Sequence, residues 1–213
     1  MRVLNTVKPS FLTVIASAAM AALVLGVVFI SAGDRSGLFS GNVGQTMKGG
    51  GNGVDFSVDM VLADGSTKPL RISELRGKIV ILEFTFIGCS ACEVLHTTGY
   101  LQNVYEKFKE KIEVVTIYIY KNTDPHTILQ YAKTYGLNWK YFAIDRSGNL
   151  IIDLRIPNLF THIFLDEDGV ERFRNPGAIN FVKTTYPTII DLMLQKKYDE
   201  LEKYHVGEII DVG

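Results

Sequence analysis

The two cysteines of the 213-residue chain stand three positions apart, at Cys89 and Cys92 in the sequence Gly-Cys-Ser-Ala-Cys. A strand-like apolar segment precedes them and a helical pattern begins at Ser90, so Cys89 is expected near a helix N-cap and Cys92 one turn inside. The unpaired N–H groups and the positive dipole end of a helix stabilise a thiolate. The spacing therefore predicts a redox pair in which Cys89 is the nucleophile and Cys92 resolves the mixed disulfide.

A structural zinc site or an inert disulfide would also use two neighbouring cysteines. Structural zinc takes four protein ligands, and the chain has no second cysteine pair. A disulfide that closes so short a loop constrains the unfolded chain little. Neither alternative is favoured, and the four histidines show no paired spacing: they are His96, His126, His162 and His205.

The composition is that of a folded protein without a nucleic-acid surface. Hydrophobic residues make up 47% of the chain and charged residues 21%, which excludes a disordered protein. The 22 basic and 23 acidic residues leave a formal net charge of -1, and the basic residues form no block. Nucleic acid is therefore not expected as a partner.

Residues 11–32 form an apolar run without a charged residue, long enough to cross a bilayer as a helix. Basic residues precede the run, which favours residues 1–10 in the cytoplasm and the rest of the chain outside. We expect an uncleaved transmembrane anchor in the cell membrane; a signal peptide cleaved near Ala32 is the alternative. Gly, Ser and Asn are frequent in residues 33–53, which predicts a flexible linker before a folded domain over residues 54–213.

Strand-like and helix-like segments alternate along this domain. Segments that are apolar on both faces are typical of covered central strands, while Asp124-Pro125 and Gly136 mark the start and the end of one helix. The order β-α-β-α-β-β-α predicts an α/β sandwich with a mixed sheet. Strands are expected at residues 56–61, 78–86, 112–120, 139–144, 161–165 and 170–173, and helices at 90–111, 125–135 and 187–204.

Residues 54–173 resemble the membrane-anchored thioredoxin-like proteins of the TlpA/ResA type. The matching features, in order, are Asp55-Phe56, Asp64-Gly65, the stretch LRISELRG ending at Gly77, the C-x-x-C at a strand–helix junction, and FLDEDG ending at Gly169. The resemblance implies a thioredoxin-like fold, with a central mixed sheet flanked by helices. It also implies an extracytoplasmic thiol–disulfide oxidoreductase that needs no cofactor. Its partners would be protein thiols and disulfides, in disulfide handling or cytochrome c maturation.

Glu83 lies six residues before Cys89, inside a strand that is apolar on both faces. Thioredoxins often have a buried acidic residue at this offset that helps to move the proton of the second cysteine, and the resemblance implies this role for Glu83. Burial raises the pKa of a carboxylic acid, which suits a proton-exchanging group. The alternative is a structural carboxylate, paired with a lysine or at a sheet edge. His96, four residues after Cys92, is expected to face solvent.

The family has a cis-proline just before the penultimate strand, facing the cysteines, where a bound peptide pairs with the loop. Phe160 stands at that position here, followed by Thr161, and the nearest proline is Pro157. A cis bond before a non-proline residue costs roughly 2.5–4 kcal/mol. Either the bond is trans, or the loop is offset and Pro157 takes the role.

The missing proline opens an alternative function, copper delivery. The chain resembles Sco-type copper proteins in its anchor, fold and cysteine pair, and they too lack this proline. The copper ligands would be Cys89, Cys92 and His162, a reasonable donor set for copper. Sco proteins, however, carry C-x-x-x-C and place the histidine four residues earlier, where this chain has Asn158.

Overall fold

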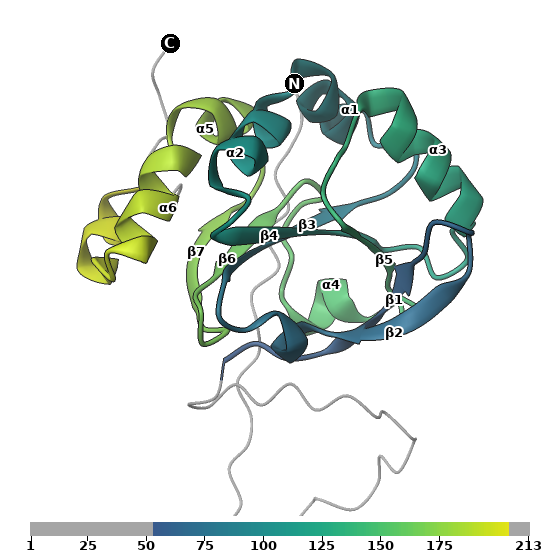
Figure 1. The fold of residues 1–213 in the computed structure, drawn as a ribbon, viewed down its shortest axis with the longest axis horizontal. Helices are drawn as coiled ribbons and strands as arrows, with labels where there is room; N and C mark the ends of the chain where they lie inside the picture. The colour runs from purple at the N-terminus through teal and green to yellow at the C-terminus, as the bar shows by residue number, and fades with distance from the viewer. Residues whose placement is uncertain (1–52, 205–213) are drawn as a thin grey trace, which may run out of the picture. The chain divides into compact units, whose positions relative to one another are not determined.

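The computed structural model describes residues 53–204, which build one mixed sheet with helices on both faces (Figure 1). The strand order is β2-β1-β5-β4-β3-β6-β7. The central strands β3, β4 and β5 run parallel, and the outer neighbours pair antiparallel. The strands are β1 Ser57–Val61, β2 Thr67–Arg71, β3 Ile79–Thr85, β4 Ile112–Tyr118, β5 Tyr141–Ile144, β6 His162–Leu165 and β7 Glu171–Asn175.

One face of the sheet is covered by most of the helices and the other by two short ones (Figure 1). The first face carries α1 Ser90–Thr98, α2 Tyr100–Phe108, α3 Pro125–Tyr135, α5 Ile179–Thr184 and α6 Tyr186–Leu194. The second carries the 3-10 helix Ile72–Leu75 and α4 Leu150–Asp153, and a second 3-10 helix, Tyr198–Tyr204, follows α6. The predicted thioredoxin-like α/β architecture is confirmed.

Strand β3 is buried along its whole length because helices cover both faces of the sheet around it. Side chains alternate between the two faces of a strand. Ile79 and Ile81 join the apolar cluster under α1, α2 and α3, whereas Val80 and Leu82 join the cluster on the opposite face. Glu83 therefore points toward the same face as Ile79 and Ile81, which is the face covered by α1, α2 and α3. Both cysteines belong to the apolar cluster on this face.

Two predicted helices are interrupted. The helix expected over residues 90–111 breaks at Gly99, whose φ of 68° is left-handed, so α1 and α2 are separate. The closing helix expected over residues 187–204 ends at Leu194, because Lys196 has a φ of 57° and the chain turns there. By contrast, α3 begins and ends where predicted, with the Asp124 side chain accepting a hydrogen bond from the N–H of Thr127.

Four short elements are not predicted by the sequence: β2, the 3-10 helix Ile72–Leu75, α4 and α5. The predicted cytoplasmic segment 1–10 and anchor 11–32 lie outside the described residues, as does the linker 33–53 apart from Gly53. Between residues 53 and 204, no helix has the length and apolar character needed to span a membrane.

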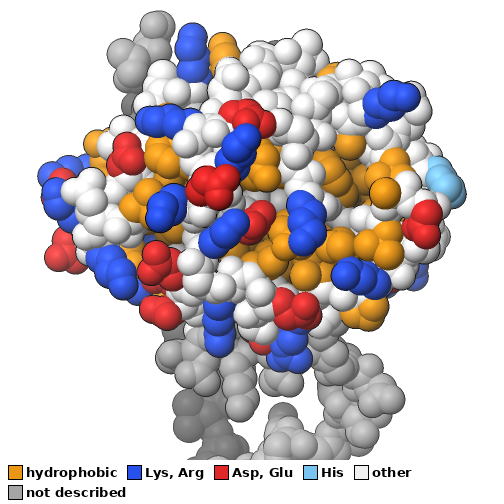
Figure 2. Space-filling model, in the orientation of Figure 1, with side chains coloured by type: hydrophobic (Ala, Val, Ile, Leu, Met, Phe, Trp, Pro, Cys, Tyr) orange, Lys and Arg blue, Asp and Glu red, His pale blue; other side chains and the backbone are white. Residues whose placement is uncertain are grey.

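Charged side chains of both signs are interleaved on the face of the domain drawn in Figure 2. Hydrophobic side chains are visible between the charged ones, and this face has no large patch that is only basic or only acidic. This distribution agrees with the formal net charge of -1.

Candidate active site

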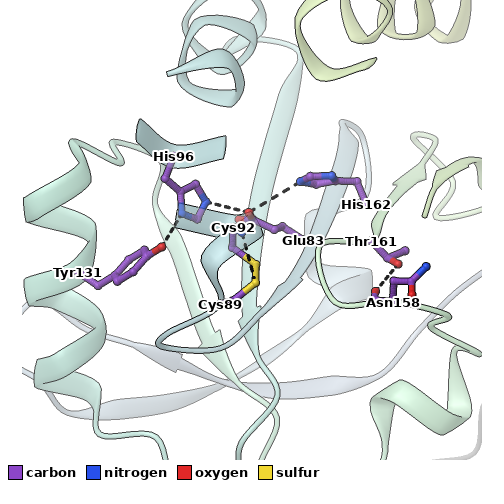
Figure 3. Close-up of a disulfide and its surroundings, with 8 residues drawn as sticks. All are labelled: Glu83, Cys89, Cys92, His96, Tyr131, Asn158, Thr161 and His162. Carbon is purple, nitrogen blue, oxygen red and sulfur yellow. Dashed lines mark hydrogen bonds and ion pairs between the residues drawn. A yellow bond between two sulfur atoms is a disulfide. The ribbon is translucent and has the colours of Figure 1, made fainter. Parts of the chain in front are cut away.

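Cys89 and Cys92 form a disulfide at the start of α1, with Cα atoms 5.3 Å apart (Figure 3). Cys89 is the N-cap residue, and its sulfur accepts a hydrogen bond from the N–H of Cys92 at 3.3 Å. Cys89 is 6% exposed, whereas Cys92 is 0% exposed. The predicted position at a strand–helix junction is confirmed, and Cys89 is the more exposed of the two cysteines.

Glu83 is a fully buried carboxylate with three polar neighbours. Its Oε1 accepts a hydrogen bond from Nε2 of His96 at 2.8 Å, and its Oε2 accepts one from the hydroxyl of Thr116 at 2.7 Å. Nε2 of His162 lies 3.8 Å from Oε1, too far for a hydrogen bond. The alternatives of a lysine partner and of an edge position are wrong, because β3 lies between β4 and β6.

The sheet register brings these groups together. Glu83 is paired with Thr116 on the parallel neighbour β4 and with His162 on the antiparallel neighbour β6. Directly paired residues project to the same face, so the three side chains meet beneath the helices. The indole N–H of Trp139 also donates to the Thr116 hydroxyl at 2.9 Å, which orients that hydroxyl toward Glu83.

The pKa of Glu83 moves opposite to the sequence-based expectation. Burial pushes this pKa upward, but the attraction and hydrogen bond of His96, the attraction of His162 and the hydrogen bond of Thr116 outweigh it. Together they lower the pKa of Glu83 from 4.5 to about 2. The predicted rise is therefore wrong, because the carboxylate is buried among polar partners rather than in an apolar strand environment.

His96 is buried, not solvent-facing as expected. Its Nδ1 lies 3.0 Å from the hydroxyl of Tyr131 on α3, while its Nε2 reaches Glu83. Residues four positions apart on a helix share one face, so His96 follows Cys92 on the inner face of α1. The four-residue spacing from Cys92 is the sequence feature that could have placed His96 in the site. No sequence feature indicates that Tyr131 contacts His96 or that Thr116 contacts Glu83.

The backbone of Phe160 pairs with Phe84 in β3, the strand that leads to the cysteines. Its N–H donates to the carbonyl of Phe84 at 2.9 Å, and the carbonyl of Thr161 accepts from the N–H of Phe84 at 3.2 Å. The Phe160 side chain is buried in the apolar cluster that includes both cysteines. Pro157 is exposed and lies three residues before Phe160.

His162 is enclosed between Glu83 and Tyr186, whose hydroxyl lies 2.8 Å from Nδ1. Burial lowers the pKa of His162 from 6.5 to about 4, against the opposing attraction of Glu83. Within residues 53–204, no three His, Cys, Asp or Glu side chains are grouped so that they could hold a metal ion. The geometry therefore gives no support to the copper alternative.

The chain belongs to the Redoxin family, whose match spans residues 42–185. Thiol-disulfide oxidoreductase ResA of Bacillus thuringiensis subsp. konkukian is 30% identical over 112 residues, which are 52% of this chain and 62% of that protein. The protein of the same name from Halalkalibacterium halodurans is 29% identical over 114 residues, 53% of this chain and 62% of that protein. The resemblance to ResA-type proteins is confirmed, over less than two thirds of these relatives' length.

Solved structures share the fold. A candidate thiol:disulfide interchange protein DsbE from Chlorobium tepidum superposes with a TM-score of 0.56 and 17% identity, over 70% of this chain and 99% of that chain. The thioredoxin domain of a thiol-disulfide oxidoreductase from Bacteroides vulgatus gives a TM-score of 0.50 and 16% identity, over 66% and 98% of the two chains. At these identities the likeness establishes the fold alone.

Proposed function

We propose that this chain catalyses thiol–disulfide exchange on protein partners through Cys89 and Cys92. The observation that carries the proposal is the cysteine pair at the start of α1, in which Cys89 is slightly exposed and Cys92 is fully buried. The ResA relatives are named for the same activity. No cofactor is needed, because the two sulfurs supply both electrons.

In the reducing direction, the Cys89 thiolate attacks a sulfur of the partner disulfide. That S–S bond breaks, and a mixed disulfide forms between Cys89 and the partner. Cys92 then loses its proton and attacks Cys89, so that the partner leaves as a dithiol and the chain keeps the disulfide. The first-turn N–H groups of α1 stabilise the Cys89 thiolate, and Glu83 takes part in moving the proton of Cys92.

We expect the loop of Phe160 and Thr161 to contact the bound partner, as the resemblance implies. We further propose that the domain acts outside the cytoplasm, held to the cell membrane by residues 11–32. The apolar run and its basic flank support this location. A thiol reagent that does not cross membranes should label reduced Cys89 in intact cells; labelling only after lysis would contradict it. Disulfide handling or cytochrome c maturation are the roles such a location suits.

A glutathione redox titration of the full-length chain in detergent tests the activity. We expect a reversible two-electron couple that Cys89→Ser and Cys92→Ser abolish. Copper content is measured on the same preparation. Absence of a couple, or stoichiometric copper that His162→Ala removes, would overturn the proposal in favour of metal delivery.

Replacing Glu83 by Gln tests its role in proton movement. Gln keeps the size and can still bond to His96 and Thr116, but it lacks the carboxylate charge. We expect resolution of the mixed disulfide to slow on the order of 100-fold, at the low end for general acid–base groups. Glu113→Gln is the control, because Glu113 is a carboxylate of the neighbouring strand that pairs with Lys78. Equal rates for the two variants would make Glu83 merely structural.

A further inference from the structure

The carboxylate of Glu83 lies between two buried histidine rings, which approach it from opposite sides (Figure 3). His96 comes from α1, the helix that carries the cysteines, and His162 comes from β6. Each ring has its second nitrogen, Nδ1, next to a tyrosine hydroxyl: Tyr131 for His96 and Tyr186 for His162. Glu83 is thus flanked by two histidine–tyrosine pairs, which we call the two arms of the site: His96 with Tyr131, and His162 with Tyr186.

The two arms end differently. Tyr186 is 0% exposed, and its hydroxyl also accepts a hydrogen bond from Nδ2 of Asn175 at 2.8 Å, so this arm is closed by protein. Tyr131 on α3 is 9% exposed. Of the two tyrosines that contact the histidines, Tyr131 is therefore the one with some exposure to solvent, whereas Tyr186 is enclosed.

The hydrogen-bond pattern fixes how His96 handles a proton. A carboxylate can only accept, so Nε2 of His96 carries the hydrogen that bonds to Glu83. In the neutral ring, Nδ1 then accepts from the Tyr131 hydroxyl; in the charged ring, Nδ1 donates to it. A proton that is added to the Glu83–His96 pair is therefore held on the side that faces Tyr131.

We propose that His96 is a positioning residue that, with Glu83, holds the proton of Cys92 during resolution and releases it toward solvent past Tyr131. This rests on the thiol–disulfide exchange proposed above. Cys92 Sγ attacks Cys89 Sγ, the bond from Cys89 to the partner sulfur breaks, and the electron pair leaves on the partner thiolate. The Cys92 proton goes to the Glu83–His96 pair, and the partner thiolate takes a proton from solvent.

Burial and hydrogen bonds set the charge of several groups at the pair. Glu83 stays ionised, and burial keeps His162 neutral by lowering its pKa to about 4. Burial raises the pKa of the Tyr118, Tyr131 and Tyr186 hydroxyls. The ionisable groups around the pair are His162 from β6, Tyr118 from β4, Tyr131 and Tyr135 from α3, Glu93 from α1 and Tyr186 from α6.

The test is the rate of mixed-disulfide resolution against pH, measured on the full-length chain in detergent with a glutathione mixed disulfide. We expect His96→Gln to slow resolution on the order of 10- to 100-fold at neutral pH, within the range of proton-transfer groups. Its rate should rise about tenfold per pH unit, because the thiolate must now form by losing its proton to solvent. Gln can still bond to Glu83, so a merely structural histidine would be rescued by it.

Two tyrosine variants form a matched pair. Tyr131→Phe and Tyr186→Phe each remove one hydroxyl from a histidine Nδ1 and leave the ring in place. We expect Tyr131→Phe to steepen the pH profile toward that of His96→Gln, and Tyr186→Phe to keep the shape of the parent profile. Both changes are small enough to retain the fold, which thermal unfolding checks.

The outcomes separate the two proposals. If the parent chain shows no glutathione couple, the proposed function fails. If the parent is active but His96→Gln and Tyr131→Phe keep its rate and pH profile, the role of His96 fails and the function stands. If the pH profile changes equally in Tyr131→Phe and Tyr186→Phe, the proposal that the proton leaves past Tyr131 is also overturned.

Discussion

At the scale of single residues, Phe160 shows how the loop beside the cysteines is built without a proline. Its φ of 80° is left-handed, which is costly for a residue with a Cβ atom. The backbone is held there by the hydrogen bond from its N–H to Phe84, and the ring is anchored in the core next to the cysteines. A proline has no N–H and could not make this bond.

Restoring the family's proline should therefore weaken the domain. In Phe160→Pro, the φ of 80° is out of reach and the carbonyl of Phe84 loses its donor. We expect a loss of at least about 1–3 kcal/mol of unfolding free energy from the unpaired buried carbonyl. Urea unfolding measures it, with Phe160→Leu as the control that keeps the N–H and an apolar side chain. A Phe160→Pro variant as stable as the parent would contradict the observed pairing.

At the scale of elements, the break at Gly99 limits α1 to the helix that carries Cys89, Cys92 and His96. The Gly99 N–H bonds to the carbonyl of His96 at 3.2 Å, and the Gln102 side chain donates to the same carbonyl at 3.0 Å. The end of α1 is thus fixed just beyond the histidine that contacts Glu83. A continuous helix over residues 90–111 would send α2 in another direction.

Gly99→Ala tests this break. Nothing lies within 4 Å of the position a Cβ atom would take, so the cost arises from the φ of 68° alone. We expect a loss of roughly 1–2 kcal/mol, the cost of a left-handed conformation for an L-residue. Thr97→Ala, at an exposed position of α1, is the control and should change the unfolding free energy by less than about 0.5 kcal/mol. Equal effects would mean that the left-handed turn is not required.

At the scale of the whole molecule, the buried polar network joins most of the fold around the disulfide. Strands β3, β4 and β6 and helices α1, α3 and α6 each contribute a member. Ionised Glu83 and neutral His162 are both favoured by folding, since their pKa values lie below the ordinary ones. Folding stability is therefore linked to pH through these two groups.

The sign of the linkage is the same for both groups. In the unfolded chain His162 binds a proton below about pH 6.5, whereas in the folded chain it does so only near pH 4. The unfolding free energy therefore falls as the pH drops from 6.5 to 4. Glu83 stabilises the fold above 4.5, and this contribution is lost toward pH 2. In the parent, protonation of His162 should lower the unfolding free energy by on the order of 3 kcal/mol between pH 6.5 and 4. We expect His162→Gln to remove this part of the pH dependence.

Urea unfolding of the oxidised chain from pH 7 to 4 measures this effect. His126→Gln replaces an exposed histidine and should follow the parent curve. If His162→Gln also follows that curve, the buried ring is not the group whose protonation destabilises the fold.

Features that depend on neighbours along the chain could be predicted from the sequence. The strand that leads into Cys89, the N-cap position of Cys89 and the ends of α3 follow from local hydrophobic patterning and capping residues. These features fix where the cysteine pair lies, and they predict that Cys89 reacts first.

The environment of Glu83, by contrast, depends on contacts between distant parts of the chain. Its neighbours His162 and Thr116 come from strands that are distant in sequence, and the register of β3 with β4 and β6 places them beside it. His96 was expected in solvent, because the covering of α1 by α3 cannot be read from one helix. A pKa responds to such contacts in space, so local patterning predicts the burial of Glu83 correctly but the direction of its pKa shift wrongly.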